Sequence, residues 1–382
     1  MSSDTPSSSS NAKEDPQVAG WTRFLSAWVA RYPKFWRRLG NLETGLLRDD
    51  LEDVSLAKPI YVGGLARSGS TLLLEILNRH PETTTHRYRD FPLLFTPYWW
   101  NKFLDSMPQP PEEAKERAHG DRLLVTSESP EAMEEVLWMA FFEGLHDETQ
   151  KNLLTGADKN ESFDAFYAEH IRKLLAVRGG SRYLSKGNYN STRIEYLGEL
   201  FPDSLFVIPV RDPVTHIESL MRQHEKFKQL HAKDHNLALH MQRVGHFEFG
   251  AMRRLVNMGD TELINEINQL WDAGQHARGW AKYWASIYGY IARTISTDKL
   301  EGRCLVIRYE DLCENPSQVI GDMANHCQLE GLEQHISDIV SDISLPTYYK
   351  SSLSSAEVDA IWEEAAQAAE QFGYFRQPRG ET

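Results

Sequence analysis

The chain has 382 residues, of which 41% are hydrophobic and 25% charged, a composition typical of globular proteins that bury a sizeable core. The length suits one elaborated α/β domain better than two ordinary domains. The formal net charge of −14 argues against a broad surface for nucleic acid or anionic membranes, since such a surface needs a positive field. An anionic ligand must therefore bind in a local basic pocket.

The N-terminus and the cysteines indicate a cytoplasmic protein. Residues 1–16 are rich in Ser, Asp and Pro and contain no apolar core of a signal peptide, so we expect a disordered tail over residues 1–17. No segment approaches the roughly 20 apolar residues of a membrane helix. Cys304, Cys313 and Cys327 lack metal-binding spacing and fit reduced thiols. We expect a single domain from residue 18 to residue 382.

An aromatic segment over residues 18–51 comes first in this domain. Trp21, Phe24, Leu25 and Trp28 recur at helical spacing and Pro33 interrupts the pattern, which predicts two short amphipathic helices. We expect them to pack on the core, with docking to a membrane surface as the alternative.

Short apolar runs followed by helical segments then alternate along the chain. Strands are predicted at residues 59–64 (PIYVGG), 182–186 (RYLSK), 205–210 (LFVIPV) and 303–308 (RCLVIR). Each precedes a helix, and Asp212 with Pro213 provides a cap and a first-turn proline for one of them. This alternation predicts an α/β core over about residues 58–330, with a central parallel sheet flanked by helices in three layers.

Long helical stretches separate these units, over about residues 111–177 and 225–297. We interpret them as insertions that form walls around the carboxyl edge of the sheet, where open α/β sheets bind ligands. A loop and a helix at residues 340–375 complete the chain.

The segment from Gly64 to Thr71 (GLARSGST) has the spacing of a phosphate-binding P-loop, except that Ser70 replaces the lysine. Its glycines allow a ligand to approach the backbone closely, and the free N–H groups and the dipole at the start of the following helix favour an anion. An ATP-cleaving enzyme needs the missing lysine, whereas Arg67 offers a planar fork of donors. We predict a phosphate site made by Arg67, Ser68, Gly69, Ser70, Thr71 and Leu72, with a ligand-free turn as the alternative.

This segment resembles the 5′-phosphosulfate loop of sulfotransferases that use 3′-phosphoadenosine 5′-phosphosulfate (PAPS). The Arg-Ser-Gly-(Ser/Thr)-Thr-Leu form is that of bacterial members and of tyrosylprotein sulfotransferases, while the cytosolic steroid and phenol branch has a lysine where Arg67 stands. The resemblance implies a P-loop-like fold, PAPS as donor, PAP as product, and no required metal.

PAPS has a separate 3′-phosphate, so the resemblance requires a second basic site. Arg211 ends the strand at residues 205–210 and Ser219 follows on the next helix, matching the Arg and Ser that bind this phosphate in the family. A guanidinium at a strand end and a hydroxyl two turns into the helix are able to converge on one phosphate. Pro209 is unusual in a central strand, and we interpret it as a bulge.

Sulfuryl transfer needs a base for the acceptor proton and a cation near the transferred group. Asp90 is our leading candidate for the base, with His86 as the alternative, because the family places its base shortly after the phosphate-loop helix. The resemblance implies that Lys186 supports the leaving oxygen and that Tyr309 lies near the adenine. The loop of Tyr348, Tyr349, Lys350 and Ser351 is a further candidate for closing over the 3′-phosphate.

The sequence thus predicts a sulfotransferase that transfers a sulfuryl group from PAPS to a hydroxyl or amine of a small molecule, sugar or lipid. A P-loop kinase using ATP and a noncatalytic nucleotide-binding protein are the alternatives. Neither nucleic acid nor a membrane is an expected partner, and the state of association, including a homodimer, is left open.

Overall fold

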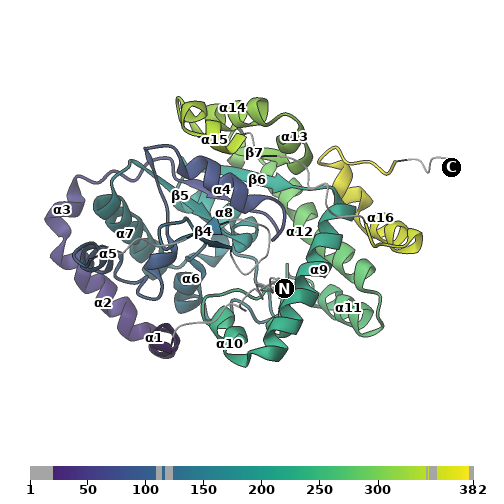
Figure 1. Ribbon diagram of the computed structural model, residues 1–382, viewed down its shortest axis with the longest axis horizontal. Helices are drawn as coiled ribbons and strands as arrows, with labels where there is room; N and C mark the ends of the chain where they lie inside the picture. The colour runs from purple at the N-terminus through teal and green to yellow at the C-terminus, as the bar shows by residue number, and fades with distance from the viewer. Residues whose placement is uncertain (1–19, 109–113, 117–123, 341–342, 344–350, 378–382) are drawn as a thin grey trace, which may run out of the picture.

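The computed structural model describes residues 20–108, 114–116, 124–340, 343 and 351–377 (Figure 1). The predicted tail at residues 1–17 and the candidate residues Tyr348, Tyr349 and Lys350 lie outside the described residues. Within them, no helix is long and apolar enough to cross a membrane.

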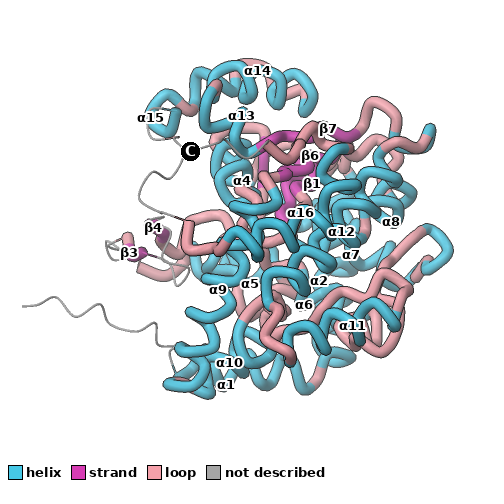
Figure 2. The backbone as a smooth tube through the Cα atoms, turned by 90° about the vertical axis from the view of Figure 1, so that its right-hand side faces the viewer, coloured by secondary structure: helices cyan, strands magenta, loops and turns pink. Residues whose placement is uncertain are grey.

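A five-stranded sheet forms the centre of the molecule (Figures 1 and 2). Its strands, in spatial order, are β2 (Thr83–Thr84), β5 (Arg182–Lys186), β1 (Ile60–Val62), β6 (Leu205–Val210) and β7 (Cys304–Arg308), and all neighbours are parallel. The four longer strands were predicted, while the two-residue β2 was not. A separate antiparallel pair joins β3 (Lys115–Glu116) to β4 (Leu124–Val125).

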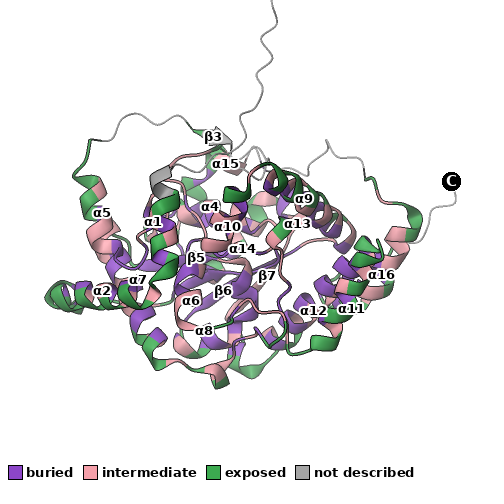
Figure 3. Cartoon of the chain, turned by 90° about the horizontal axis from the view of Figure 1, so that it is seen from below, coloured by how far each residue is buried: buried purple, intermediate pink, exposed green. Residues whose placement is uncertain are grey.

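Helices cover both faces of the sheet, which confirms the three-layer α/β prediction. Successive side chains of β1 point to opposite faces of the sheet, and each face is buried in its own core cluster. Ile60 and Val62 belong to one cluster and Tyr61 to the other. The Ile60 face is covered by α4 (Ser70–Asn78), α13 (Tyr309–Glu314) and α14 (Pro316–Cys327). In Figure 3 the strands lie buried inside a shell of helices whose outer faces are exposed.

The Tyr61 face carries the larger core. Its helices are α6 (Glu135–Phe141), α7 (Glu161–Arg178), α8 (Ile194–Leu200), α9 (Pro213–Lys233), α10 (His235–Arg243), α11 (Thr261–Asp272), α12 (His276–Ile295) and α16 (Ser355–Glu370). The two predicted helical insertions supply α6, nearly all of α7, α10, α11 and α12, together with the C-terminal part of α9. As predicted, the Asp212 side chain caps α9 by accepting a hydrogen bond from Thr215 N at 3.0 Å.

Pro209 does not form the predicted bulge. The pairing of β6 with β7 stays in register from Phe206 to Val210. Leu205 N donates to Pro59 O and Phe206 N donates to Arg303 O, so odd-numbered positions of β6 direct their amide toward β1. Because β1 ends at Val62, the missing N–H of Pro209 would lie beyond the last β1 residue and interrupts no ladder.

The N-terminal prediction is confirmed in outline, with α1 (Gly20–Arg31), α2 (Pro33–Leu46) and a short α3 (Arg48–Glu52). Trp36 packs in a core cluster with Phe166 of α7, but Phe24 is 75% exposed and Phe35 is 48% exposed. This segment therefore packs on the core through one face only. Helix α5 (Pro97–Asp105) follows later in the chain and packs against α7. Near the C-terminus, α15 (Ser337–Val340) precedes α16.

Candidate functional site

The predicted phosphate loop connects β1 to α4. Arg67 and Gly69 have positive φ angles of 71° and 100°, and α4 begins at Ser70 without a side-chain cap. The first-turn amides of a helix have no acceptor within the helix, and the helix dipole adds partial positive charge there. The loop is thus shaped to face an anion with backbone N–H groups.

Gly69 also fixes how closely the loop approaches its neighbour. A Cβ at this position would lie 2.8 Å from Cδ2 of Tyr309, so only glycine fits between the loop and this ring. A Cβ at Gly64 would lie 2.8 Å from Pro209 O. Gly69 therefore serves a close contact as well as a positive φ, whereas Gly64 serves a close contact.

Helix α9 holds the other side of the loop through a buried histidine. Trp284 Nε1 donates to His216 Nδ1 at 3.1 Å, so the Nε2 proton is the one that reaches Ala66 O at 2.9 Å. Burial lowers the pKa of His216 to about 3. A neutral histidine therefore fixes the loop to α9 at physiological pH.

The two predicted phosphate sites meet at this helix. Arg67 Nε lies 3.5 Å from Oγ of the buried Ser219. Arg211, at the end of β6, has its guanidinium carbon 4.9 Å from the centre of the Tyr309 ring and donates from Nε to Thr215 Oγ1 at 3.1 Å. Arg67 is therefore linked to Ser219, and Arg211 to Tyr309, whose ring also faces the phosphate loop.

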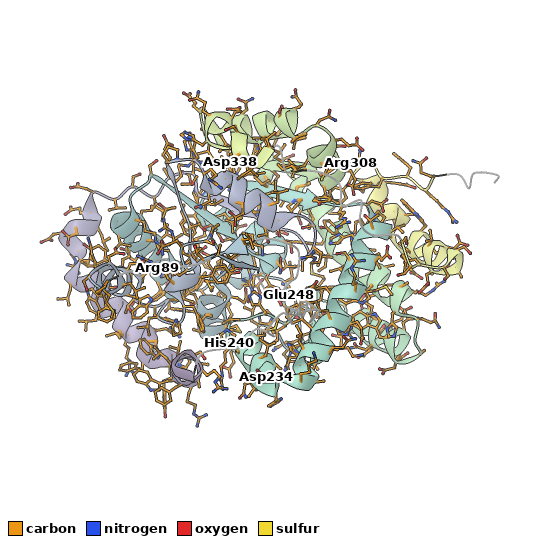
Figure 4. All side chains as sticks on the ribbon, in the orientation of Figure 1. Arg89, Asp234, His240, Glu248, Arg308 and Asp338 are labelled. Atoms are coloured by element: carbon orange, nitrogen blue, oxygen red, sulfur yellow. The ribbon has the colours of Figure 1, made fainter. Side chains whose placement is uncertain are left out.

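Lys186 ends β5, the strand next to β1, and pairs in register with Val62. Its side chain is largely buried and lines a recess beyond the loop, bounded by α6 and by the segment after α10. In Figure 4 the labelled Glu248 of that segment lies between the ribbons of α6 and α9. The lining residues are Ala132, Glu134, Glu135, Trp138, Lys186, Gly187, Asn188, Tyr189, Asn190, Arg193, Gly245, His246 and Glu248.

Two carboxylates in this recess already have partners. Arg193 donates to both oxygens of Glu135 at 2.7 and 2.8 Å, and His146 Nε2 lies 2.6 Å from Glu135 Oε1. Burial would raise the pKa of Glu135, but the charge of Arg193 and the contacts with Arg193 and His146 lower it to about 2. Glu134 accepts hydrogen bonds from the hydroxyls of Tyr167, Tyr183 and Ser185.

The predicted base, Asp90, does not fit the geometry of its site. Its Oδ1 pairs with Arg178 and accepts from Asn101 Nδ2 at 3.1 Å, while Oδ2 accepts from Arg87 N at 2.9 Å and contacts His86 Nδ1 at 3.0 Å. Burial would raise the pKa of Asp90, but the His86 hydrogen bond and the Arg178 charge outweigh it and hold that pKa well below the usual range. A carboxylate so stabilised is a poor proton acceptor.

The alternative base, His86, is equally enclosed. Its ring nitrogens contact Asp90 and His170 Nε2, each at 3.0 Å, and only 2% of its side chain is exposed. Asp90 and His86 thus lie inside a buried network that anchors the turn after β2. The assignment of either residue as the base stays a prediction, and this network disfavours it.

The recess adds three residues that sequence reasoning missed. Asn188, His246 and Glu248 lie beside Lys186, although His246 and Glu248 belong to a stretch that we interpreted only as a wall. Asn188 follows Lys186 by two positions, so its place near Lys186 was predictable from the sequence. No sequence pattern connects Asn188 to Glu248, which is 60 positions away.

The loop also fits a phosphosulfate group. It combines the first-turn amides of α4, which no side chain caps, with the guanidinium of Arg67, and both are groups that bind such an anion. Among the described residues, no group of three or more His, Cys, Asp or Glu side chains is arranged to hold a metal ion. The three cysteines are free thiols.

A parallel sheet covered on both faces, with a phosphate-type loop between its first strand and the following helix, defines an α/β protein of the P-loop-like class. Two family models match the chain: one described as the sulfotransferase family over residues 59–261, and one described as the sulfotransferase domain over residues 201–372. The first covers more than half of the chain, and the chain belongs to the sulfotransferase family.

Several solved structures are similar at low sequence identity, and the first of them shows the same fold. Sulfotransferase STF9 from Mycobacterium avium is similar at 15% identity and a TM-score of 0.54, covering 94% of this chain and 88% of that one. STF1 from Mycobacterium tuberculosis H37Rv has 14% identity and a TM-score of 0.44, covering 93% and 86%. The sulfotransferase domain from the Synechococcus PCC 7002 olefin synthase has 18% identity and a TM-score of 0.38, covering 85% and 98%. No curated protein matches the chain.

Proposed function

We propose that the protein transfers a sulfuryl group from PAPS to a hydroxyl or amine acceptor. The observation that carries the proposal is the pairing of the β1–α4 loop with a second basic position at the end of β6, in a chain of the sulfotransferase family. Arg67 and Arg211 provide two separate cationic positions, which suits a donor that carries a 5′-phosphosulfate and a separate 3′-phosphate.

The donor's 5′-phosphosulfate would be held by the first-turn amides of α4 and by Arg67. Arg211 and Ser219 would bind the 3′-phosphate, and the exposed face of Tyr309 would support the adenine. Arg67 and Ser219 are 3.5 Å apart, which supports a short, continuous donor site along α9.

Lys186 would act on the transferred group. Its strand neighbours the loop strand, so the ammonium stem extends from the same sheet edge as the loop. During transfer the acceptor atom forms a bond to sulfur while the bridging S–O bond to the phosphate breaks, and PAP leaves with the bonding electron pair. A cation near the sulfuryl and bridging oxygens stabilises the charge that develops on them.

Calorimetry with PAP, AMP and ATP with magnesium tests the donor. We expect PAP to bind more tightly than AMP by about 10- to 100-fold, because charge-assisted hydrogen bonds contribute about 1.5–3 kcal/mol. Tight binding of magnesium-ATP with indifference to PAP would establish a kinase and overturn the proposal. PAP binding without transfer from radiolabelled PAPS to phenols, alcohols, sugars, amines or water would instead establish a noncatalytic nucleotide-binding protein.

A further inference from the structure

The recess beside Lys186 contains a second set of polar groups that the donor does not use. Asn188, two residues after Lys186, donates from Nδ2 to Glu248 Oε1 at 2.6 Å. Glu248 Oε2 in turn lies 3.6 Å from His246 Nδ1. A strand-end amide therefore holds a carboxylate, and the carboxylate lies against an imidazole, all in the recess that Lys186 also lines.

This arrangement orients the imidazole. The His246 backbone N–H donates to Met241 O at 2.8 Å, which fixes the backbone after α10. The Nδ1 proton faces Glu248, so in the neutral ring the lone pair is on Nε2. The His246 side chain is 29% exposed, compared with 2% for His86, and a proton is able to leave it for solvent after each turnover.

Other walls of the recess contain polar atoms without partners. The Asn188 Oδ1 is buried and accepts no hydrogen bond from the described part of the chain, and the indole N–H of the buried Trp138 likewise finds no acceptor there. Buried polar atoms are almost always satisfied, so a group from outside the chain is expected to supply the missing donor and acceptor. Polar groups of an acceptor molecule beyond its reacting hydroxyl offer both.

The neighbouring carboxylates are less suited to take a proton. Glu135 is held by Arg193 and His146, which lower its pKa, and Glu134 already accepts three hydroxyl hydrogen bonds. Among the described lining residues, His246 combines a partly exposed side chain with an Nε2 atom that points away from Glu248.

We propose that this recess binds the hydroxyl of an alcohol or phenol acceptor, that His246 is the catalytic base, and that Glu248 is its positioning residue. The inference rests on the proposed function and names the acceptor site for it. The acceptor oxygen attacks sulfur and its proton passes to His246 Nε2. The bridging S–O bond breaks, Lys186 stabilises the oxygen that leaves, and PAP departs with the electron pair.

The charges that face His246 suit this role. Burial and the charge of Lys186 lower the pKa of His246, whereas the carboxylates of Glu248 and Glu131 raise it. The effect of Glu248 prevails, so the pKa of His246 lies above its ordinary value near 6.5. A base whose pKa lies near the working pH transfers protons most efficiently.

The test compares His246→Ala, His246→Gln and Glu248→Gln with the wild type. The control is His326→Ala, which removes a half-buried histidine on α14 whose Nε2 contacts Phe206 O at 3.2 Å. Radiolabelled PAPS is mixed with excess enzyme and a panel of phenols and alcohols, and sulfate released to water is counted as transfer. PAP affinity is measured by calorimetry on each protein.

We expect both His246 variants to transfer about 100-fold or more slowly, with PAP affinity unchanged and with added imidazole restoring part of the rate in His246→Ala. The rate of the wild type should rise with pH as His246 loses its proton. In Glu248→Gln the pKa falls, so this acid limb moves to lower pH, a shift that a merely structural role would not produce.

Transfer at the wild-type rate by a His246→Ala variant that binds PAP would overturn the inference, as would an acid limb that stays in place in Glu248→Gln. If the wild type does not bind PAP, the donor proposal fails instead, so the two failures are distinguishable.

Discussion

The buried pair of Asp90 and Arg178 provides a direct test of whether Asp90 is structural or catalytic. In Asp90→Asn the charge of Arg178 is left without its partner. Both oxygens of Asp90 face N–H donors, so an asparagine NH2 group must oppose at least one of them. Breaking a buried ion pair from one side costs about 3–5 kcal/mol, and we expect the free energy of unfolding to fall by that amount.

The assay is urea unfolding from pH 7 to pH 3. The pKa of Asp90 is depressed in the folded protein, so its contribution to stability is fully present above the unfolded pKa near 3.9 and is lost as the pH falls through the lower folded value. The difference between wild type and Asp90→Asn should therefore be constant from pH 7 to about pH 5 and shrink below about pH 4. The double variant Asp90→Asn/Arg178→Met should regain a large part of the loss, because it removes the unpaired charge.

Sulfate transfer by the folded fraction is the matched functional readout. We expect the folded Asp90→Asn protein to retain the rate and pH profile of the wild type. Wild-type stability combined with a loss of transfer of about 100-fold or more would refute this reasoning and restore Asp90 as the base.

Further predictions concern the donor loop and the core. Gly69→Ala should weaken PAP binding at least about tenfold, since the new Cβ would lie 2.8 Å from the Tyr309 ring. The control is Gly373→Ala, also at positive φ but with nothing within 4 Å, which should cost only about 1–2 kcal/mol of stability without affecting PAP binding. Calorimetry measures the first effect and urea unfolding the second. Arg211→Met should reduce PAP affinity by about 10- to 100-fold and leave AMP affinity unchanged, and equal losses for both ligands would place Arg211 outside the 3′-phosphate site. Lys173→Met should destabilise the fold by about 3–5 kcal/mol because it leaves the buried Glu43, 2.9 Å away, without its cation, and urea unfolding that shows additive losses with Glu43→Gln would contradict a coupled pair.

Local sequence patterns determine much of this fold, and those parts were predictable. The runs at residues 182–186 and 205–210 became β5 and β6 with unchanged bounds, because apolar strands buried on both faces leave a continuous hydrophobic signal. Asp212 and Pro213 fixed the start of α9 for a similar reason, since a cap and a first-turn proline act within a few residues of each other.

Pro209 shows where local reasoning fails. A proline in a central strand removes an amide, but whether the loss matters depends on which neighbour that amide faces and where the neighbour ends. Here β1 has three residues, and its short length follows from the phosphate loop that starts after it. The sequence of β6 alone contains none of this information.

Asp90 illustrates the same limit at the candidate site. Its position after the phosphate-loop helix was a sound reason to expect a base, yet Arg178 comes from the last turn of α7, nearly ninety positions later. A carboxylate changes from a potential base to a structural anion through that single long-range contact. Charge partners of this kind are set by tertiary packing, which residue spacing does not encode.

The end of β5 connects the two halves of the proposed mechanism. Lys186 and Asn188 are separated by one residue, and Asn188 holds Glu248 while Lys186 lines the same recess, where we propose that it faces the sulfuryl group. A single rigid strand would therefore set the positions of both the cation at the leaving oxygen and, through Glu248, the base at the attacking oxygen. Asn188→Ala should consequently lower the rate of transfer and shift its acid limb as Glu248→Gln does, while PAP affinity stays unchanged.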